Sequence, residues 1–116
     1  MLVDSHCHLE LDTFGDELAA VIGRAREAGV GAFVAVGASR VHRGASEALA
    51  LAERHADVFA AVGVHPHEAQ GAADDAAALP HIDSLLHHPK VVALGEVGLD
   101  YFYKLSPPAV QQQIFA

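Results

Sequence analysis

The chain of 116 residues has few basic residues, few aromatic residues and no tryptophan. It contains 7 Lys and Arg against 15 Asp and Glu, so its net charge is −8 with neutral histidines. Because neutralising a phosphate backbone requires Lys and Arg, this composition excludes a broad basic surface for nucleic acid. A phosphate-bearing substrate would need bound metal ions to supply local positive charge.

Cysteine is almost absent as well. The single Cys7 cannot form an internal disulfide, which favours a reducing, cytoplasmic compartment. We expect Cys7 to be a small buried filler. The N-terminus lacks the basic and apolar regions of a signal peptide, and no apolar run approaches the ~20 residues of a membrane span. We therefore predict a cytoplasmic protein that does not enter the membrane.

Three common fingerprints of catalytic or cofactor sites are missing. The chain has no Gly-x-Gly-x-x-Gly dinucleotide motif, no P-loop and no Gly-x-Ser-x-Gly nucleophile elbow. Its 52% hydrophobic and 19% charged residues are nevertheless typical of a globular protein. Any chemistry must therefore come from another set of side chains.

Four strand candidates alternate with segments of helical periodicity. They cover residues 2–5, 32–36, 59–62 and 91–94 and start about thirty residues apart, the size of a βα unit. The last three are apolar throughout, which is typical of parallel strands buried on both faces. The pattern predicts one α/β domain over residues 1–116, either as half of a (β/α)8 barrel or as a small open sheet. Both sheet edges would be unpaired, which would allow self-association.

Helices are expected between these strands. Residues 14–25 have apolar positions at helical spacing, as do residues 41–52. Pro80 is expected in the first turn of a short helix that ends before Pro89. Ser106 is expected to cap the N-terminus of a last helix that begins with prolines.

Two His-x-His pairs are the most informative feature, and the first is His6-Cys7-His8. Side chains at positions i and i+2 of a strand point to the same face, so His6 and His8 can bind one ion while Cys7 faces away. Asp4 can lie on their side of the strand. Imidazole suits Zn, Mn, Fe, Co or Ni, so the pair does not identify the metal. The alternative is an inert, hydrogen-bonded pair at a strand end.

The second pair is His65-Pro66-His67, directly after the third strand candidate. Pro66 prevents a regular continuation of the strand, so the pair lies on a turn at the carboxyl end of the strand, where barrel enzymes place their sites. We predict that His65 contacts a substrate phosphate or carboxylate or moves a proton, and that His67 contacts the substrate. The alternative is a stiff loop with surface histidines.

Glu96 follows the fourth strand candidate, between Gly95 and the loop of Gly98. A carboxylate after four apolar residues is costly unless it is paired or bound to metal, and its two oxygens can bridge two ions. Asp100 and Tyr101, just beyond, suit orientation of a ligand or contact with substrate. The alternative for Glu96 is an exposed strand-end carboxylate. The remaining histidines are expected to be solvated surface residues: His42, His55, His81, His87 and His88.

Three segments together resemble signature segments of the TatD-type metal-dependent deoxyribonucleases. These are residues 4–9, 63–67 and 95–101, and Ser106 with residues 111–115 resembles the next helix of that family. The resemblance implies a TIM barrel with two divalent ions, such as Mg, Mn or Zn, that hydrolyses phosphodiester bonds of DNA. It implies that His6 and His8 bind one metal and that Glu96 bridges the two. His65 and Asp100 are the expected catalytic residues, and His67 and Tyr101 the expected substrate contacts.

The same resemblance leaves the metal centre incomplete. The family's remaining ligands, two His and an Asp on later strands, have no matching positions in this chain, which corresponds to about four βα units at the N-terminal part of a single barrel domain. Two other interpretations stay open. One is an amidohydrolase-like enzyme that hydrolyses a small-molecule ester or amide, and the other is a catalytically inactive truncated fragment.

Overall fold

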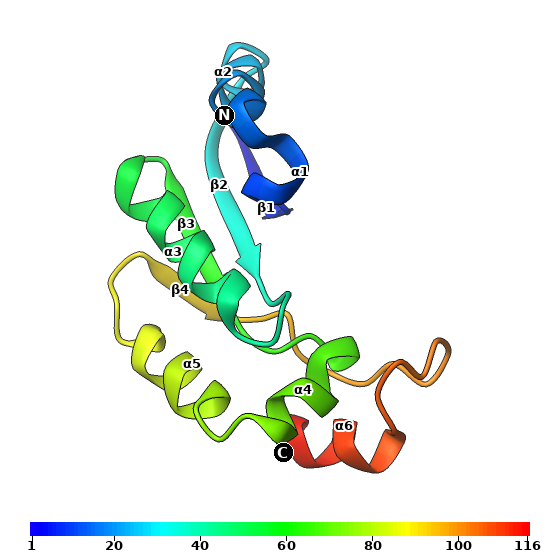
Figure 1. Ribbon diagram of the computed structural model, residues 1–116. Coiled ribbons are helices and arrows are strands. Elements are labelled where there is room, and N and C mark those ends of the chain that lie inside the picture. Colours follow the sequence, from blue (N-terminus) through cyan, green and yellow to red (C-terminus); the bar gives the residue numbers. More distant parts are fainter.

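The computed structural model describes residues 1–116 and has one parallel sheet of four strands (Figure 1). The strands are β1 (Leu2–Cys7), β2 (Val30–Gly37), β3 (Val58–Val62) and β4 (Val91–Leu94), and each pairs with the next along the chain. Parallel neighbours in sequence order with helical connections are the organisation of a (β/α) barrel segment. The predicted α/β fold with four βα units is confirmed.

The helical segments lie between these strands as expected, with some different boundaries. They are α1 (Leu11–Phe14), η1 (Gly15–Glu17), α2 (Leu18–Glu27), α3 (Arg43–Arg54), η2 (Pro66–Glu68), α4 (Ala69–Asp74), α5 (Ala78–Leu86) and α6 (Pro108–Phe115). The helix predicted over residues 14–25 is interrupted, because Gly15 adopts a positive φ of 49° that ends α1, and α2 starts only at Leu18. Pro80 lies in the first turn of α5, as predicted.

Ser106 does not cap α6, so this prediction was wrong. The N-cap residue is Pro107, and no side chain caps the helix. Ser106 is instead fully buried, and its hydroxyl donates to the carbonyl of His67 and accepts from the backbone N–H of Gln70. A buried hydroxyl needs hydrogen-bond partners, and here the segment that follows β3 provides them.

The core lies between the sheet and the helices that cover one of its faces. Helix α3 packs on β2 and β3, α5 packs on β4, and the two helices contact each other (Figure 1). The central strands are buried, but the edge strands are not: Leu2 on β1 is 62% exposed and Val92 on β4 is 54% exposed. The expected burial therefore holds for most of β3 and for the carboxyl half of β2 only. None of the helices is long and apolar enough to span a membrane.

The register of the sheet brings the carboxyl ends of all four strands to one rim. Cys7 pairs with Ala35, Gly37 with Val62, and Val62 with Leu94. The residues that immediately follow each strand are therefore neighbours, although they lie up to about ninety positions apart in the sequence. The histidine pairs and Glu96 occupy this rim.

Candidate metal centre

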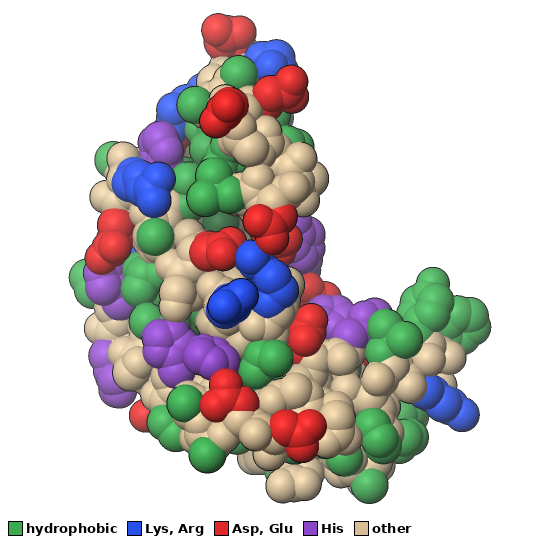
Figure 2. Space-filling model, in the orientation of Figure 1, with side chains coloured by type: hydrophobic (Ala, Val, Ile, Leu, Met, Phe, Trp, Pro, Cys, Tyr) green, Lys and Arg blue, Asp and Glu red, His purple; other side chains and the backbone are tan.

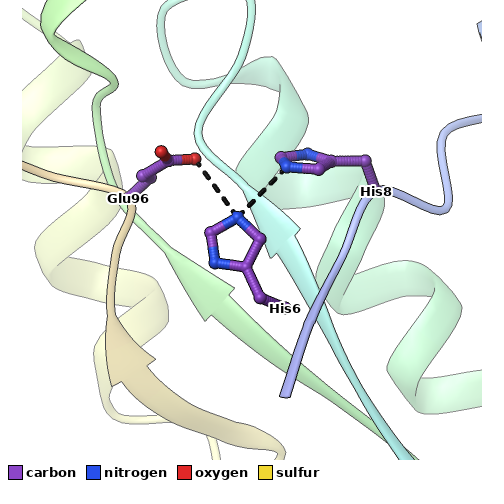
Figure 3. A group of neighbouring side chains, drawn as sticks. All are labelled: His6, His8 and Glu96. Atoms are coloured by element: carbon purple, nitrogen blue, oxygen red, sulfur yellow. Dashed lines mark hydrogen bonds and ion pairs between the residues drawn. The ribbon is translucent and has the colours of Figure 1, made fainter. Parts of the chain in front are cut away.

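His6 and His8 project from the end of β1 with their rings close together (Figure 3). Their Nε2 atoms are 3.2 Å apart. Two imidazoles on one tetrahedral ion, each at a metal–nitrogen distance of about 2.0–2.1 Å, place their ligand atoms about 3.3 Å apart. The observed spacing fits the chelation of a single ion, and it equally fits the hydrogen bond that the two rings make with each other here.

Glu96 reaches the same place from the end of β4 (Figure 3). Its Oε2 atom is 3.6 Å from His6 Nε2, and one ligand atom from each of His6, His8 and Glu96 lies within 4.8 Å of the others. The donor set of two imidazoles and one carboxylate suits a divalent transition metal. The structure thus brings together the three side chains that the sequence predicts as ligands, while their binding of an ion stays a prediction.

Asp4 and Cys7, which lie close to His6 in the sequence, do not belong to the group of candidate ligands. The carboxylate of Asp4 accepts a hydrogen bond from the backbone N–H of His6, at 3.3 Å. Cys7 points to the other side of the strand, where its thiol donates to the carbonyl of Val34. Burial, and secondarily the charge of Asp4, raises the pKa of Cys7 to about 11, so the thiol is neutral and unsuited to bind metal as a thiolate.

His65 approaches Glu96 from β3. Its Nδ1 atom accepts a hydrogen bond of 3.0 Å from the backbone N–H of His67, which leaves the proton of the neutral ring on Nε2. That Nε2 atom is 3.6 Å from Glu96 Oε1. Partial burial lowers the pKa of His65, and the negative charge of Glu96 opposes this effect. The ring can therefore present an N–H donor beside the carboxylate.

A cleft of about 180 Å³ lies between these side chains. It is lined by His8, Ala38, Ser39, His65, His67, Glu68 and Glu96. A larger cavity of about 250 Å³ lies elsewhere, between β4, α5 and α6, but its lining is almost entirely hydrophobic and contains no titratable side chain. Acid–base or metal chemistry therefore belongs to the smaller cleft.

His67 is oriented by Asp100, which lies on the loop after β4. The Nε2 atom of His67 makes a direct hydrogen bond with Asp100 Oδ2. This bond, and then the backbone N–H groups of Tyr103 and Phe102, hold the pKa of the Asp100 carboxyl below its usual range. Tyr101 turns toward α6, where its hydroxyl accepts a hydrogen bond of 2.7 Å from Gln112 Nε2.

The other five histidines lie outside the cleft. His42 pairs with Asp75, His81 with Ser46, His88 with Glu53, and His55 lies near Arg26, while His87 is exposed. All these partners belong to the outer helices and the loops that connect them. They connect surface elements and do not contribute to the rim.

Sequence analysis did not detect two residues that support the site, Ser106 and Gln111. They are the only buried polar residues of the chain. Gln111 Oε1 accepts from the backbone N–H of Asp100 at 2.7 Å, and its Nε2 donates to the carbonyls of Asp100 and Ser106. The amide and the hydroxyl thus join α6, the Asp100 loop and the His67 backbone. The signal in the sequence was the resemblance of Ser106 and residues 111–115 to the next helix of the TatD-type family, which did not indicate that these two side chains support the site.

Replacing Gln111 with alanine should lower the free energy of unfolding by about 1–3 kcal/mol, because the buried carbonyl of Ser106 and the partly buried backbone groups of Asp100 would lose their partners. Urea unfolding followed by circular dichroism measures this. Gln113→Ala, on the exposed side of the same helix, is the matched control, since it makes the same change in helix propensity. Equal stability of the two variants would contradict the supporting role of Gln111.

Comparisons with known proteins place the chain in a family. A family model described as TatD related DNase matches residues 3–116. YabD of Bacillus subtilis strain 168, an uncharacterised metal-dependent hydrolase, is 36% identical over 115 residues, which are 99% of this chain and 44% of that protein. The 3′-5′ ssDNA/RNA exonuclease TatD of Edwardsiella piscicida is 35% identical over 115 residues, covering 98% and 43%.

A solved structure is similar as well. The crystal structure of YjjV, a TatD homologue from Escherichia coli K12, superposes with a TM-score of 0.81 at 31% identity, over 98% of this chain and 43% of that chain. The chain thus spans less than half of the length of the relatives that it matches. With four parallel βα units and a family match over residues 3–116, it belongs to the TatD-related DNase family.

Proposed function

We propose that this chain carries part of the active site of a metal-dependent hydrolase that cleaves phosphodiester bonds of DNA. The observation that carries the proposal is the convergence of His6, His8 and Glu96 from opposite edges of the sheet. The names of the relatives support it, since they include metal-dependent hydrolases and an exonuclease that acts on single-stranded DNA and RNA. Membership of the family supports the same chemistry.

In this proposal His6 and His8 hold one divalent ion. The two oxygens of Glu96 face different neighbours, because Oε2 is 3.6 Å from His6 and Oε1 is 3.6 Å from His65. A carboxylate in this position would serve as a ligand of one or two divalent ions beside His6 and His8. Two ions, from the group of Mg, Mn and Zn, are part of the proposal. When bound, such ions polarise a phosphoryl oxygen and lower the pKa of water toward about 7.

The side chains beside the ligands have separate roles. His65 presents its Nε2–H to the cleft and would donate a hydrogen bond to an oxygen of the scissile phosphate. Asp100 holds the ring of His67 in one orientation, so that this ring can contact the substrate. Tyr101, on the same loop, is proposed as a further substrate contact.

Because the cleft is negatively charged, the divalent ions would be needed for binding the phosphodiester as well as for hydrolysing it. Glu68 and Glu96 both line the cleft, and no Lys or Arg does. A phosphodiester would be repelled by these carboxylates unless cations neutralise them. Removal of the ions should therefore weaken substrate binding in addition to stopping hydrolysis.

The proposal is tested with the purified chain, Mn²⁺ or Mg²⁺, and a labelled single-stranded oligonucleotide. We expect very weak cleavage that requires the ion, or none, because three protein ligands make an incomplete site for two ions. Chain carrying Glu96→Gln, purified in parallel, is the control for contaminating nuclease and should be inactive. Cleavage that is equal in this variant, or that persists in a metal chelator, would overturn the proposal.

Two other outcomes would favour the alternative interpretations. Metal-dependent hydrolysis of small esters or amides, with DNA left intact, would indicate an amidohydrolase-like reaction. Metal binding at His6, His8 and Glu96 without any hydrolysis would indicate a chain that is catalytically inactive by itself.

We also propose a cytoplasmic location, on the basis of the single cysteine, and self-association through the open edges of β1 and β4. Exposed apolar side chains at both edges, such as Leu2 and Val92, support the second proposal. Analytical ultracentrifugation of the chain measures its oligomeric state, and a monomer at every concentration would contradict self-association.

A further inference from the structure

The loop after β4 exposes an unusual run of aromatic side chains. Three of the seven aromatic residues of the chain are consecutive, Tyr101-Phe102-Tyr103. Phe102 is 86% exposed and Tyr103 is 66% exposed. Figure 2 shows hydrophobic side chains at the tip of a projecting arm, beside a group of histidines. Large adjacent rings left in water are a recognised mark of a binding surface.

Hydrogen bonds define the shape of this loop. The Oδ1 atom of Asp100 accepts from the backbone N–H groups of Phe102, at 2.9 Å, and Tyr103, at 3.1 Å. Asp100 is itself held by the buried Gln111. The rings of Phe102 and Tyr103 meet edge to face, with centroids 4.9 Å apart. The two rings are thus presented in a defined arrangement at the end of an anchored turn.

The exposed rings continue the row of rings that begins in the metal cleft. The His65 and His67 ring centroids are 4.2 Å apart, and His67 and Tyr103 are 5.9 Å apart. His65 lies beside Glu96 at one end of the row, and Phe102 is at the other end. A polymer with its backbone at the metal ligands would therefore pass its neighbouring units over Tyr103 and Phe102.

We propose that Phe102 and Tyr103 form a stacking platform for the bases of single-stranded nucleic acid. This inference rests on the proposed function, because it takes the reacting phosphodiester to lie in the cleft. Every base has a π-face, so stacking on aromatic rings retains a strand without reading its sequence. The platform also compensates for the acidic surface, on which phosphate contacts are scarce: Lys104 is the only basic residue in the segment 91–116.

The platform predicts a preference for unpaired bases. In a duplex the faces of the bases are already stacked on each other, and exposing them requires unstacking and unpairing. A single strand or a frayed end offers its base faces directly. Phe102 and Tyr103 would therefore select single-stranded over double-stranded nucleic acid. The metal ligands would have the separate role of hydrolysing the phosphodiester.

The test compares the binding of three labelled ligands by fluorescence anisotropy: a single-stranded oligothymidylate, an abasic strand of the same length and a blunt hairpin. It is done with metal chelator and again with Ca²⁺. We expect the oligothymidylate to bind more tightly than both other ligands. Phe102→Ala and Tyr103→Ala should each weaken its binding about tenfold, while binding of the abasic strand stays unchanged. Phe102→Tyr should retain binding.

Phe115→Ala is the matched control, because Phe115 is another exposed aromatic residue but lies on α6. It should leave oligothymidylate binding unchanged. With Ca²⁺ present, equal binding of normal and abasic strands, preferential binding of the hairpin, or no measurable binding would each overturn the inference. Base-dependent binding without metal-dependent cleavage would leave the inference standing and favour a chain that is catalytically inactive by itself over the proposed hydrolase. Metal-dependent cleavage without base-dependent binding would support the proposed hydrolase and refute the stacking platform.

Discussion

His6→Ala is expected to lower the affinity of the chain for Mn²⁺ by at least about 100-fold, because even a residue that only orients a metal ligand can account for about 10–100-fold. His6 is the central member of the group, with its Nε2 atom 3.2 Å from His8 and 3.6 Å from Glu96. Its removal would leave one imidazole and one carboxylate, His8 and Glu96, which follow different strands. Isothermal titration calorimetry with Mn²⁺ or Zn²⁺ measures the change.

His87→Ala is the control for this experiment. His87 is exposed at the end of α5, away from the rim. Its substitution also replaces a histidine with alanine, as His6→Ala does. The His87→Ala variant should bind Mn²⁺ with the same affinity as the unsubstituted chain. If His6→Ala and His87→Ala bind Mn²⁺ equally well, the ion is bound elsewhere and the candidate metal centre is refuted.

Gly63→Ala should destabilise the protein by about 1–3 kcal/mol and weaken metal binding at the same time. A Cβ atom at Gly63 would stand 2.8 Å from the carbonyl carbon of Gly95 and 2.9 Å from the carbonyl oxygen of Glu96. These are backbone atoms, which cannot rotate away as a side chain can. The end of β4 would have to move, and Glu96 would move with it. Urea unfolding measures the first effect and calorimetry with Mn²⁺ the second.

Gly23→Ala separates this steric effect from the general consequence of adding a methyl group. Gly23 lies inside α2, and a Cβ atom there meets nothing within 4 Å. This variant should gain about 0.5–1 kcal/mol of stability and bind the ion normally, because alanine is favoured over glycine within a helix. If Gly63→Ala behaves like Gly23→Ala, the close approach of β3 and β4 does not position Glu96.

The arrangement of the strands was largely predictable because a buried parallel strand leaves a simple pattern. The run Val91–Leu94 is apolar throughout and coincides with β4, and the run at residues 59–62 differs from β3 by one residue. Once four such strands are parallel, their carboxyl ends lie on one rim. The shared rim of His6, His8 and Glu96 then follows from topology, but their approach from opposite edges of the sheet also requires the sheet to curve toward a barrel.

The supporting residues were not predictable in this way. Gln111, Gln112 and Gln113 are identical in type, yet only Gln111 is buried and bonded to the Asp100 backbone. Successive residues of a helix point about 100° apart, so the tertiary packing of α6 decides which of the three faces inward. Ser106 shows the same limit, since its sequence context is that of a cap but its hydroxyl bonds to the segment after β3.

The amino-acid sequence by itself determined the α/β class, the order of the elements and the types of side chain at the strand ends. Apolar periodicity and turn residues act locally along the chain, so they can be read without coordinates. Only the tertiary structure decided the 3.2 Å spacing of the two imidazoles, the backbone contact at Gly63 and the row of rings from His65 to Phe102. The contact of Gly63 with Gly95 and Glu96 and that of His67 with Tyr103 join residues far apart in sequence, so they depend on how strands and helices pack. The spacings within each pair of nearby rings depend on side-chain conformation, which the packing also selects.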